Sequence, residues 1–267
     1  DSFDVIVPSL PGFIFSTPLA RTGIGPLRTA DLLVRLMKEN LGYERFAAQG
    51  GDWGALVTTQ LGHQYPESLI GIHLTNAFPV PPFNGNRPWS IVSVGGGDGD
   101  DPARLPEQID YQKRFAAHIA THVLHPQTLS YAMHDSPVGL LAWMLEKRFS
   151  WGDARGYDER RFTREHLVTT MSLYWLTDSF VTSARFYAEA AKEKWTQARE
   201  TMPQIPTPTA ISVFEHDKGP GSTDWTRDHH HLRQPRGHPA GRPFAPSGST
   251  TAALLDSLDH FRAPDGA

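Results

Sequence analysis

Hydrophobic residues along this chain form short, largely β-branched or aliphatic runs that alternate with longer segments of helical spacing. Four runs have the length and composition of buried strands: Val5–Val7, Phe46–Gln49, Leu69–Leu74 and Thr209–Phe214. Between residues 25 and 40 the apolar positions recur at helical spacing, and a second helix is expected from Leu56 to about Tyr65. This alternation predicts a parallel sheet with right-handed helical crossovers.

The middle of the chain interrupts this alternation. Residues 76–101 are rich in proline and glycine, and residues 105–195 have a mostly helical pattern with many tryptophans and tyrosines. A proline-rich break at 203–208 then precedes the last of the four strands. We therefore predict an α/β core at 1–78, a linker and helical cap at 79–202, and the rest of the core at 203–267.

Both ends of the predicted sheet are unusual. The chain enters a strand within its first residues, so we expect further strands upstream that this sequence lacks. Residues 215–251 contain scattered prolines, glycines and histidines with few aliphatic residues. A complete sheet should have one more strand there, and the hydrophobic pattern predicts none.

Composition excludes several classes of protein. The net charge is −4, from 25 Lys and Arg against 29 Asp and Glu, which argues against a nucleic-acid-binding surface. The absence of cysteine excludes disulfides, cysteine-ligated zinc and a thiol nucleophile. No apolar run approaches the ~20 residues that span a bilayer. We expect a soluble, cytoplasmic protein with no cofactor, no metal and no membrane partner.

The segment Gly50–Ala55 (GGDWGA) has the pattern of a nucleophile elbow between a strand and a helix. Such a turn is tight, so its flanking positions need Gly or Ala. It holds one side chain, here the carboxylate of Asp52, beside the positive end of a helix. A carboxylate can attack an sp³ carbon and form an ester, which water then hydrolyses. The alternative is an aspartate that only caps a helix.

Several motifs, taken together and in order, resemble those of the microsomal-type epoxide hydrolases of the α/β-hydrolase superfamily. They cover about residues 3–217 and are Val7–Gly12, Gln49–Gly54, Pro126–Leu129, Asp135–Leu140, Tyr174–Thr177 and Arg185–Tyr187. The resemblance implies an α/β-hydrolase core with an inserted helical cap. It also implies conversion of an epoxide and water to a vicinal diol without a cofactor.

The resemblance assigns roles to individual residues. Asp52 would be the nucleophile, and the backbone N–H of Trp53 would stabilise the oxyanion during ester hydrolysis. Tyr187 would hydrogen-bond the epoxide oxygen, unless it only packs its ring in the cap. Asp217 would orient the catalytic histidine, with Glu215 as the alternative acid. An aspartate that merely caps a turn is the other interpretation of Asp217.

Three features of the sequence depart from the family pattern. Ile14 occupies a position at which the family has glycine. The family's oxyanion turn, His-Gly-x-Pro, would precede this sequence and is absent from it. A second cap tyrosine is expected where this chain has His118. Assistance by Tyr187 alone, or with help from His118, is therefore open, although a histidine on a helix face is the simpler interpretation.

The catalytic histidine is the largest departure. Alignment with the family places Pro243 at its position, and His238 is the best histidine nearby. One back-translation of residues 238–243, read one base later, encodes Ile-Pro-Arg-Gly-Gly-His. We therefore hypothesise that part of residues 225–243 is out of frame. The histidines at 229–231 are interpreted as a solvated loop rather than a metal site, and His260 as structural.

Two rival functions use the same residues. A haloalkane dehalogenase also has an aspartate nucleophile on this fold, and a remnant of the family could have lost catalysis. Cap aromatics are compatible with a cleft for a small apolar epoxide: Trp143, Trp151, Trp175 and Phe186. The sequence predicts neither the substrate, its stereochemistry nor the oligomeric state.

Overall fold

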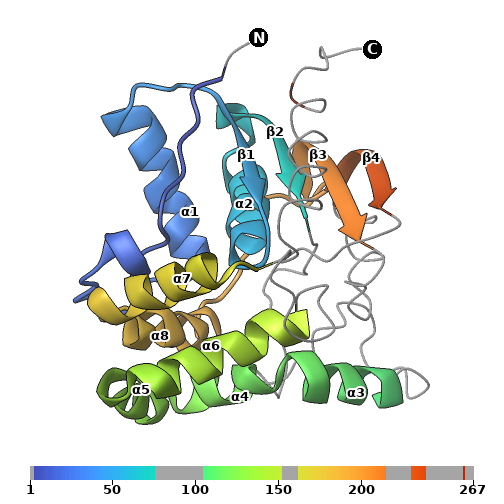
Figure 1. Cartoon of the computed structure of the whole chain (residues 1–267). Coiled ribbons are helices and arrows are strands. Elements are labelled where there is room, and N and C mark those ends of the chain that lie inside the picture. The colour runs from blue at the N-terminus through green and yellow to red at the C-terminus, as the bar shows by residue number, and fades with distance from the viewer. Residues whose placement is uncertain (1–2, 76–104, 152–161, 215–229, 239–260, 262–267) are drawn as a thin grey trace.

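A computed structural model describes residues 3–75, 105–151, 162–214, 230–238 and 261 of this chain. Its described strands form one parallel sheet in the order β1-β2-β3-β4 (Figure 1). Their bounds are β1 Phe46–Gly50, β2 Leu69–Leu74, β3 Ile205–Phe214 and β4 His230–His238. The first three strands confirm the prediction from hydrophobic runs.

The register aligns the carboxyl ends of the strands at one edge of the sheet. Gly50 of β1 pairs with Leu74 of β2, Leu74 with Ile211 of β3, and Ile211 with Pro235 of β4. In parallel sheets, ligand sites form outside this edge, because the loops that follow the strands meet there.

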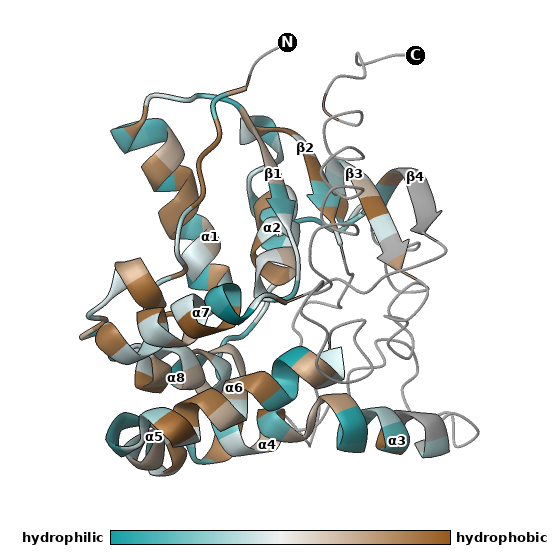
Figure 2. Cartoon of the chain, in the orientation of Figure 1, coloured by the Kyte–Doolittle hydropathy of each residue, from teal (hydrophilic) through white to brown (hydrophobic). Residues whose placement is uncertain are grey.

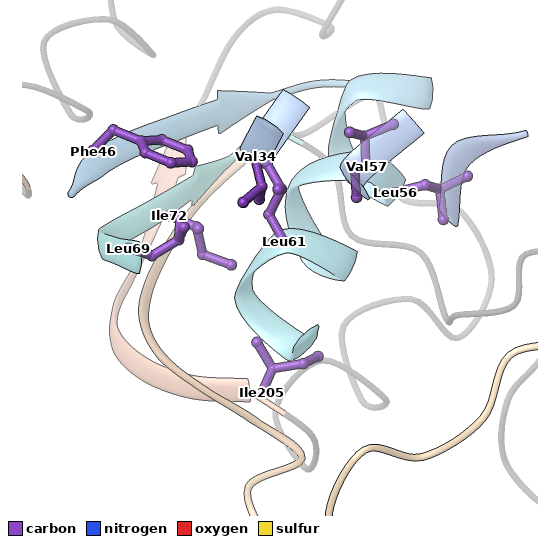
Figure 3. Packing of buried hydrophobic residues seen from close by; sticks show 9 residues of the cluster. Val34, Phe46, Leu56, Val57, Leu61, Leu69, Ile72 and Ile205 are labelled. Carbon is purple, nitrogen blue, oxygen red and sulfur yellow. The ribbon is translucent and has the colours of Figure 1, made fainter. Parts of the chain in front are cut away.

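Two helices from the first half of the chain cover the sheet. Helix α1 (Pro26–Arg35) continues into a π-helical turn, Leu36–Asn40, and helix α2 (Trp53–Gln64) connects β1 to β2 through a short 3₁₀ turn, Pro66–Ser68. Their apolar faces and the strands form one buried cluster (Figure 3): Ala30, Val34, Phe46, Leu56, Val57, Leu61, Leu69, Ile72 and Ile205. This core fixes the orientation of α2, at whose first turn the candidate site begins.

The segment between β2 and β3 is helical where it is described, and its helices lie beyond one end of the sheet (Figure 1). Their bounds are α3 Leu105–Phe115, α4 Ala117–Leu124, α5 Pro126–Asp135, α6 Pro137–Trp151, α7 Arg164–Leu176 and α8 Phe180–Ala190. Helix α8 packs against α4 and α5. Met133, Leu140, Phe180 and Ala184 form a second buried cluster there. Figure 2 shows brown, hydrophobic stretches along α5 and α6. The predicted order of sheet, helical insertion and sheet matches this arrangement.

The prediction of a strand at Val5–Val7 is wrong. This segment is irregular, and Val5 and Val7 are 76% and 85% exposed. A strand needs a neighbour to pair its backbone N–H and C=O groups. Within the described residues β1 pairs with β2 alone, so nothing pairs with the Val5–Val7 backbone. β-branched composition by itself therefore does not make a strand.

The absence of a strand in the tail was also predicted wrongly, because β4 lies within it. Its backbone pairs with β3 from Ile205↔His230 to Phe214↔His238, although its composition is polar. It contains Pro235, which a strand tolerates at the edge of a sheet, where one side needs no partner. No described helix combines the length and the apolar character needed to cross a membrane.

Candidate active site

A tight turn between β1 and α2 presents Asp52. Its backbone has a φ of 51°, in the left-handed region that residues other than glycine rarely adopt. A Cβ at Gly50 would lie 2.1 Å from the carbonyl oxygen of Gly54, so only glycine fits there. At Gly54 an added Cβ would meet no atom within 4 Å outside its own helix, so of these two glycines only Gly50 is required by close contact. The strained turn holds Asp52 at the carboxyl edge of the sheet.

The carboxylate of Asp52 is held by the helix that follows it. Its Oδ1 accepts a 2.7 Å hydrogen bond from the backbone N–H of Trp53, so Asp52 is also the N-cap of α2. Burial raises the pKa of this carboxyl above its ordinary value, and the bond from Trp53 opposes that rise. Capping and nucleophilic roles are thus compatible at this residue, because only one of its two oxygens receives this bond.

Tyr187 on α8 lies close to this turn. Its ring meets the Trp53 ring edge-on at 4.6 Å, and the neighbouring Phe186 contacts Trp53 at 5.1 Å. Burial raises the pKa of the Tyr187 hydroxyl, the negative charge of Asp52 raises it further, and a side-chain hydrogen bond with Trp53 opposes both. The same carboxylate also raises the pKa of Tyr174 on α7, though less than burial does. Tyr187 is therefore a protonated phenol within electrostatic range of Asp52.

His118 on α4 completes this group of residues. Its Nε2 lies 3.2 Å from the Tyr187 hydroxyl oxygen, and its side chain is buried. Burial lowers its pKa to about 3, with smaller contributions from His122 and Lys147. His118 thus lies on a face of α4, as the simpler interpretation has it, and that face is buried, with a neutral imidazole against Tyr187.

Sequence reasoning overlooked His122, one turn further along α4. Its ring lies 4.8 Å from the Tyr187 ring and 5.7 Å from that of Trp143. Burial lowers its pKa to about 4. The spacing of four between the two histidines places them on one helix face, a signal that the sequence contained. Of the other cap aromatics, Phe186 is buried against Trp53 and Trp151 contacts His118.

The remaining predicted residues lie in β4 or come after β3 and β4 in the sequence. Asp217 and its alternative Glu215 lie outside the described residues, as do Pro243 and His260. His238 is the last residue of β4, paired in register with Phe214. Its backbone is thus at the same sheet edge as Asp52, three strands away. His230 and His231 belong to β4, so the loop predicted for them is wrong, and the described part of the chain holds no cluster of potential metal ligands.

Comparison with known proteins adds independent findings. A family model described as "alpha/beta hydrolase fold" matches residues 1–99. A protein of Stigmatella aurantiaca whose name provisionally calls it an epoxide hydrolase is 37% identical over 214 residues, covering 80% of this chain and 46% of that protein. "Epoxide hydrolase 1" of Oryctolagus cuniculus is 31% identical over 225 residues, covering 79% and 49%.

A solved structure gives the same result for the fold. The juvenile hormone epoxide hydrolase of the silkworm Bombyx mori superposes with a TM-score of 0.70 at 25% identity, covering 96% of this chain and 63% of that one. The chain spans about half the length of the curated relatives that it matches, 46% and 49% for the two above.

Proposed function

This chain has the α/β-hydrolase fold and is a relative of the epoxide hydrolases, and on that premise we propose that it hydrolyses epoxides to vicinal diols through a covalent ester on Asp52. The observation that carries the proposal is the Asp52 turn, where a strained aspartate is bonded to the N–H of Trp53 and lies near the protonated Tyr187.

In the first step Oδ2 of Asp52, the carboxylate oxygen that is not hydrogen-bonded to the Trp53 N–H, attacks an epoxide carbon. The C–O bond of the strained ring breaks, and its electron pair goes to the epoxide oxygen. Tyr187 donates a hydrogen bond, and finally its proton, to that oxygen as negative charge develops. The product is a hydroxyalkyl ester of Asp52.

In the second step water attacks the carbonyl carbon of this ester. The carbonyl oxygen corresponds to Oδ1, which the Trp53 N–H contacts at 2.7 Å, so the same donor stabilises the oxyanion that forms. A histidine takes the proton from the attacking water, and collapse of the tetrahedral intermediate releases the diol and restores the carboxylate. The proton on the histidine then returns through solvent to Tyr187, which gave up its own in the first step. The hydrogen bond from the Trp53 N–H to Asp52 therefore contributes to both steps.

We assign the water-activating role to His238, oriented by Asp217. The parallel sheet supports this assignment, because the carboxyl ends of β3 and β4 lie at the same edge of the sheet as Asp52. The substrate would be a small apolar epoxide, since the aromatic rings of Trp53 and His118 pack against that of Tyr187. A cytoplasmic location remains our prediction.

The decisive experiment is a single turnover with excess protein over an aryl epoxide in ¹⁸O-labelled water. The covalent route gives a transient mass adduct on Asp52 and a first-turnover diol without label, because the diol oxygen comes from the carboxylate. The label then appears in Asp52 itself. Labelled diol with no adduct would overturn the covalent mechanism, and absence of both diol and adduct would overturn the function.

Matched controls distinguish the two rival functions. Asp52→Asn should form no adduct during this single turnover. An adduct that persists without diol means that Asp52 reacts but no histidine activates water, as expected of an impaired remnant. Halide release from a haloalkane, without diol from any epoxide, would favour a dehalogenase.

A further inference from the structure

The hydroxyl of Tyr187 lies beside the imidazole of His118, and the direction of the hydrogen bond between them determines where the tyrosine proton can point. Nε2 of His118 lies 3.2 Å from the hydroxyl oxygen. A protonated Nε2 donates to this oxygen, whereas an unprotonated Nε2 accepts the tyrosine proton. Whether His118 donates or accepts decides whether the tyrosine proton is free.

The surroundings of His118 favour the tautomer with the proton on Nε2. His118 is 7% exposed, and its Nδ1 is buried with no hydrogen-bond partner among the residues that the structure describes. A proton on Nδ1 would therefore be an orphaned buried N–H, which folded proteins rarely contain. A proton on Nε2 is instead donated to the Tyr187 oxygen. Edge contacts with Trp151 at 4.9 Å and with His122 at 5.5 Å fix the imidazole ring in this position.

We propose that His118 is a positioning residue for Tyr187: its Nε2–H donates to the tyrosine oxygen, so that the tyrosine proton is not given to the histidine and is directed at the epoxide oxygen. This inference rests on the proposed function. A phenol that accepts a hydrogen bond is also a stronger donor, because hydrogen bonds in a chain polarise one another.

The contact is specific to this histidine. His122 presents its ring to the same tyrosine at 4.8 Å, but within the described part of the chain neither of its ring nitrogens has a hydrogen-bond partner. The two histidines share a helix face, a similar burial and a similar distance to Tyr187, and they differ in the hydrogen bond. His122 therefore provides a matched control for every measurement on His118.

The kinetic test measures the rate of ester formation on Asp52 by rapid quench and intact mass. His118→Phe keeps a ring and removes the donor, and we expect a decrease of about tenfold, the effect of losing one well-placed hydrogen bond. His118→Gln places an amide N–H near the Nε2 position and should recover most of the rate. His122→Phe should stay within about twofold of the wild type. Equal losses in both Phe variants would overturn the proposal.

A double-mutant cycle tests whether His118 acts through Tyr187. In a Tyr187→Phe background the hydroxyl is absent, so His118→Phe should cause no further loss of rate. Losses that multiply would show that His118 acts independently, and the positioning role would be wrong. Thermal melts of each variant show whether a loss of alkylation rate arises from unfolding. If His118→Phe is unfolded, the rate of His118→Gln provides the test instead.

A spectroscopic readout separates this inference from the proposed function. The ¹⁵N chemical shifts of the His118 ring report its tautomer in the unreacted protein, with or without activity. We expect a protonated Nε2 whose resonance moves in Tyr187→Phe. A proton on Nδ1 would overturn the positioning role even in an active enzyme. If the Nε2–H tautomer is found but no epoxide alkylates Asp52, the proposed function is wrong. The hydrogen bond from His118 to Tyr187 is then still confirmed.

Discussion

The backbone N–H of Trp53 donates a 2.7 Å hydrogen bond to Oδ1 of Asp52, the residue that precedes it. This bond makes the two carboxylate oxygens different, because one is fixed at the N-terminus of α2. It also favours the ionised form, whereas burial favours the neutral form and raises the pKa overall. Asp52 is therefore a basic carboxylate, held at a turn whose strain the surrounding core maintains.

The raised pKa of Asp52 predicts the acid limb of the alkylation rate. Only the ionised carboxylate attacks, so the alkylation rate should fall with decreasing pH. It should reach half its maximum at a pH above 3.8, the ordinary pKa of aspartate. Burst alkylation measured between about pH 7 and pH 4 tests this, after a return to neutral pH has verified that activity recovers. A rate that stays constant down to pH 4 would contradict the raised pKa.

Replacement of the Tyr187 hydroxyl should affect the alkylation step selectively. Tyr187→Phe keeps the ring contacts with Trp53 and removes the donor to the epoxide oxygen, so alkylation should slow about 100-fold. Hydrolysis of the ester, once formed, should change little, because the Trp53 N–H stabilises that oxyanion. Separate rates for adduct formation and decay provide the measurement. Tyr131→Phe, at a tyrosine 69% exposed on α5, should leave both rates unchanged.

Local patterns were sufficient to predict the first three strands and the turn that presents Asp52. The sequence from Gly50 to Ala55 specifies that turn within six residues. Elements that depend on distant partners were not predictable in this way. Val5–Val7 has strand composition without a pairing neighbour, and β4 has a pairing neighbour without strand composition.

The same reason applies to the candidate site. The bond between His118 and Tyr187 joins residues 69 positions apart, and only the packing of α4 against α8 brings them together. The sequence indicated both residues, Tyr187 by resemblance and His118 as a departure from it. It could not show that they touch.

The departure at Ile14 has a structural cost that can be measured. Ile14 has a φ of 41°, a conformation strongly disfavoured for a β-branched residue. Ile14→Gly should raise the free energy of unfolding by about 1 kcal/mol, which corresponds to a few degrees in Tm. Ile14→Ala keeps a Cβ at the same φ and loses side-chain contacts, so it should be less stable than the glycine variant. Equal or reversed stabilities would show that the backbone there is not strained.

Glu193 caps helix α1 from a distant part of the chain. Its carboxylate accepts hydrogen bonds from the backbone N–H groups of Gly25, Leu27 and Arg28 at 3.2, 2.9 and 3.1 Å. Gly25, at the N-cap position, has no side chain to do so. Glu193→Ala should therefore destabilise the protein by about 1–2 kcal/mol, because three N–H groups of the first turn, two of them in partly buried hydrogen bonds, lose their acceptor.

Two further variants test this capping role by chemical denaturation. Glu193→Gln keeps an acceptor oxygen and loses the charge that favours a helix N-terminus, so its stability should be intermediate. Glu39→Ala, at an exposed glutamate paired with Arg35, should change stability by less than about 0.5 kcal/mol. A Glu193→Ala variant as stable as Glu39→Ala would exclude the capping role.

His63 makes folding stability depend on pH between its folded and unfolded pKa values. It is buried at the end of α2, and its Nε2 accepts a 3.1 Å hydrogen bond from the N–H of Ala198 while its ring packs on Trp195. Burial, with a smaller contribution from Arg199, lowers its pKa from 6.5 to about 4. The unfolded chain therefore binds more protons between these values, and the free energy of unfolding should decrease as pH falls from 6.5 towards 4.

The variant His63→Gln separates this contribution from those of His118 and His122, which have the same sign. Glutamine can accept the bond from Ala198 and does not titrate, so the decrease in stability between about pH 6.5 and pH 5 should become shallower. Urea denaturation at several pH values measures the slope. A His63→Gln slope equal to that of the wild type would mean that His63 is protonated as readily in the folded protein as in the unfolded chain.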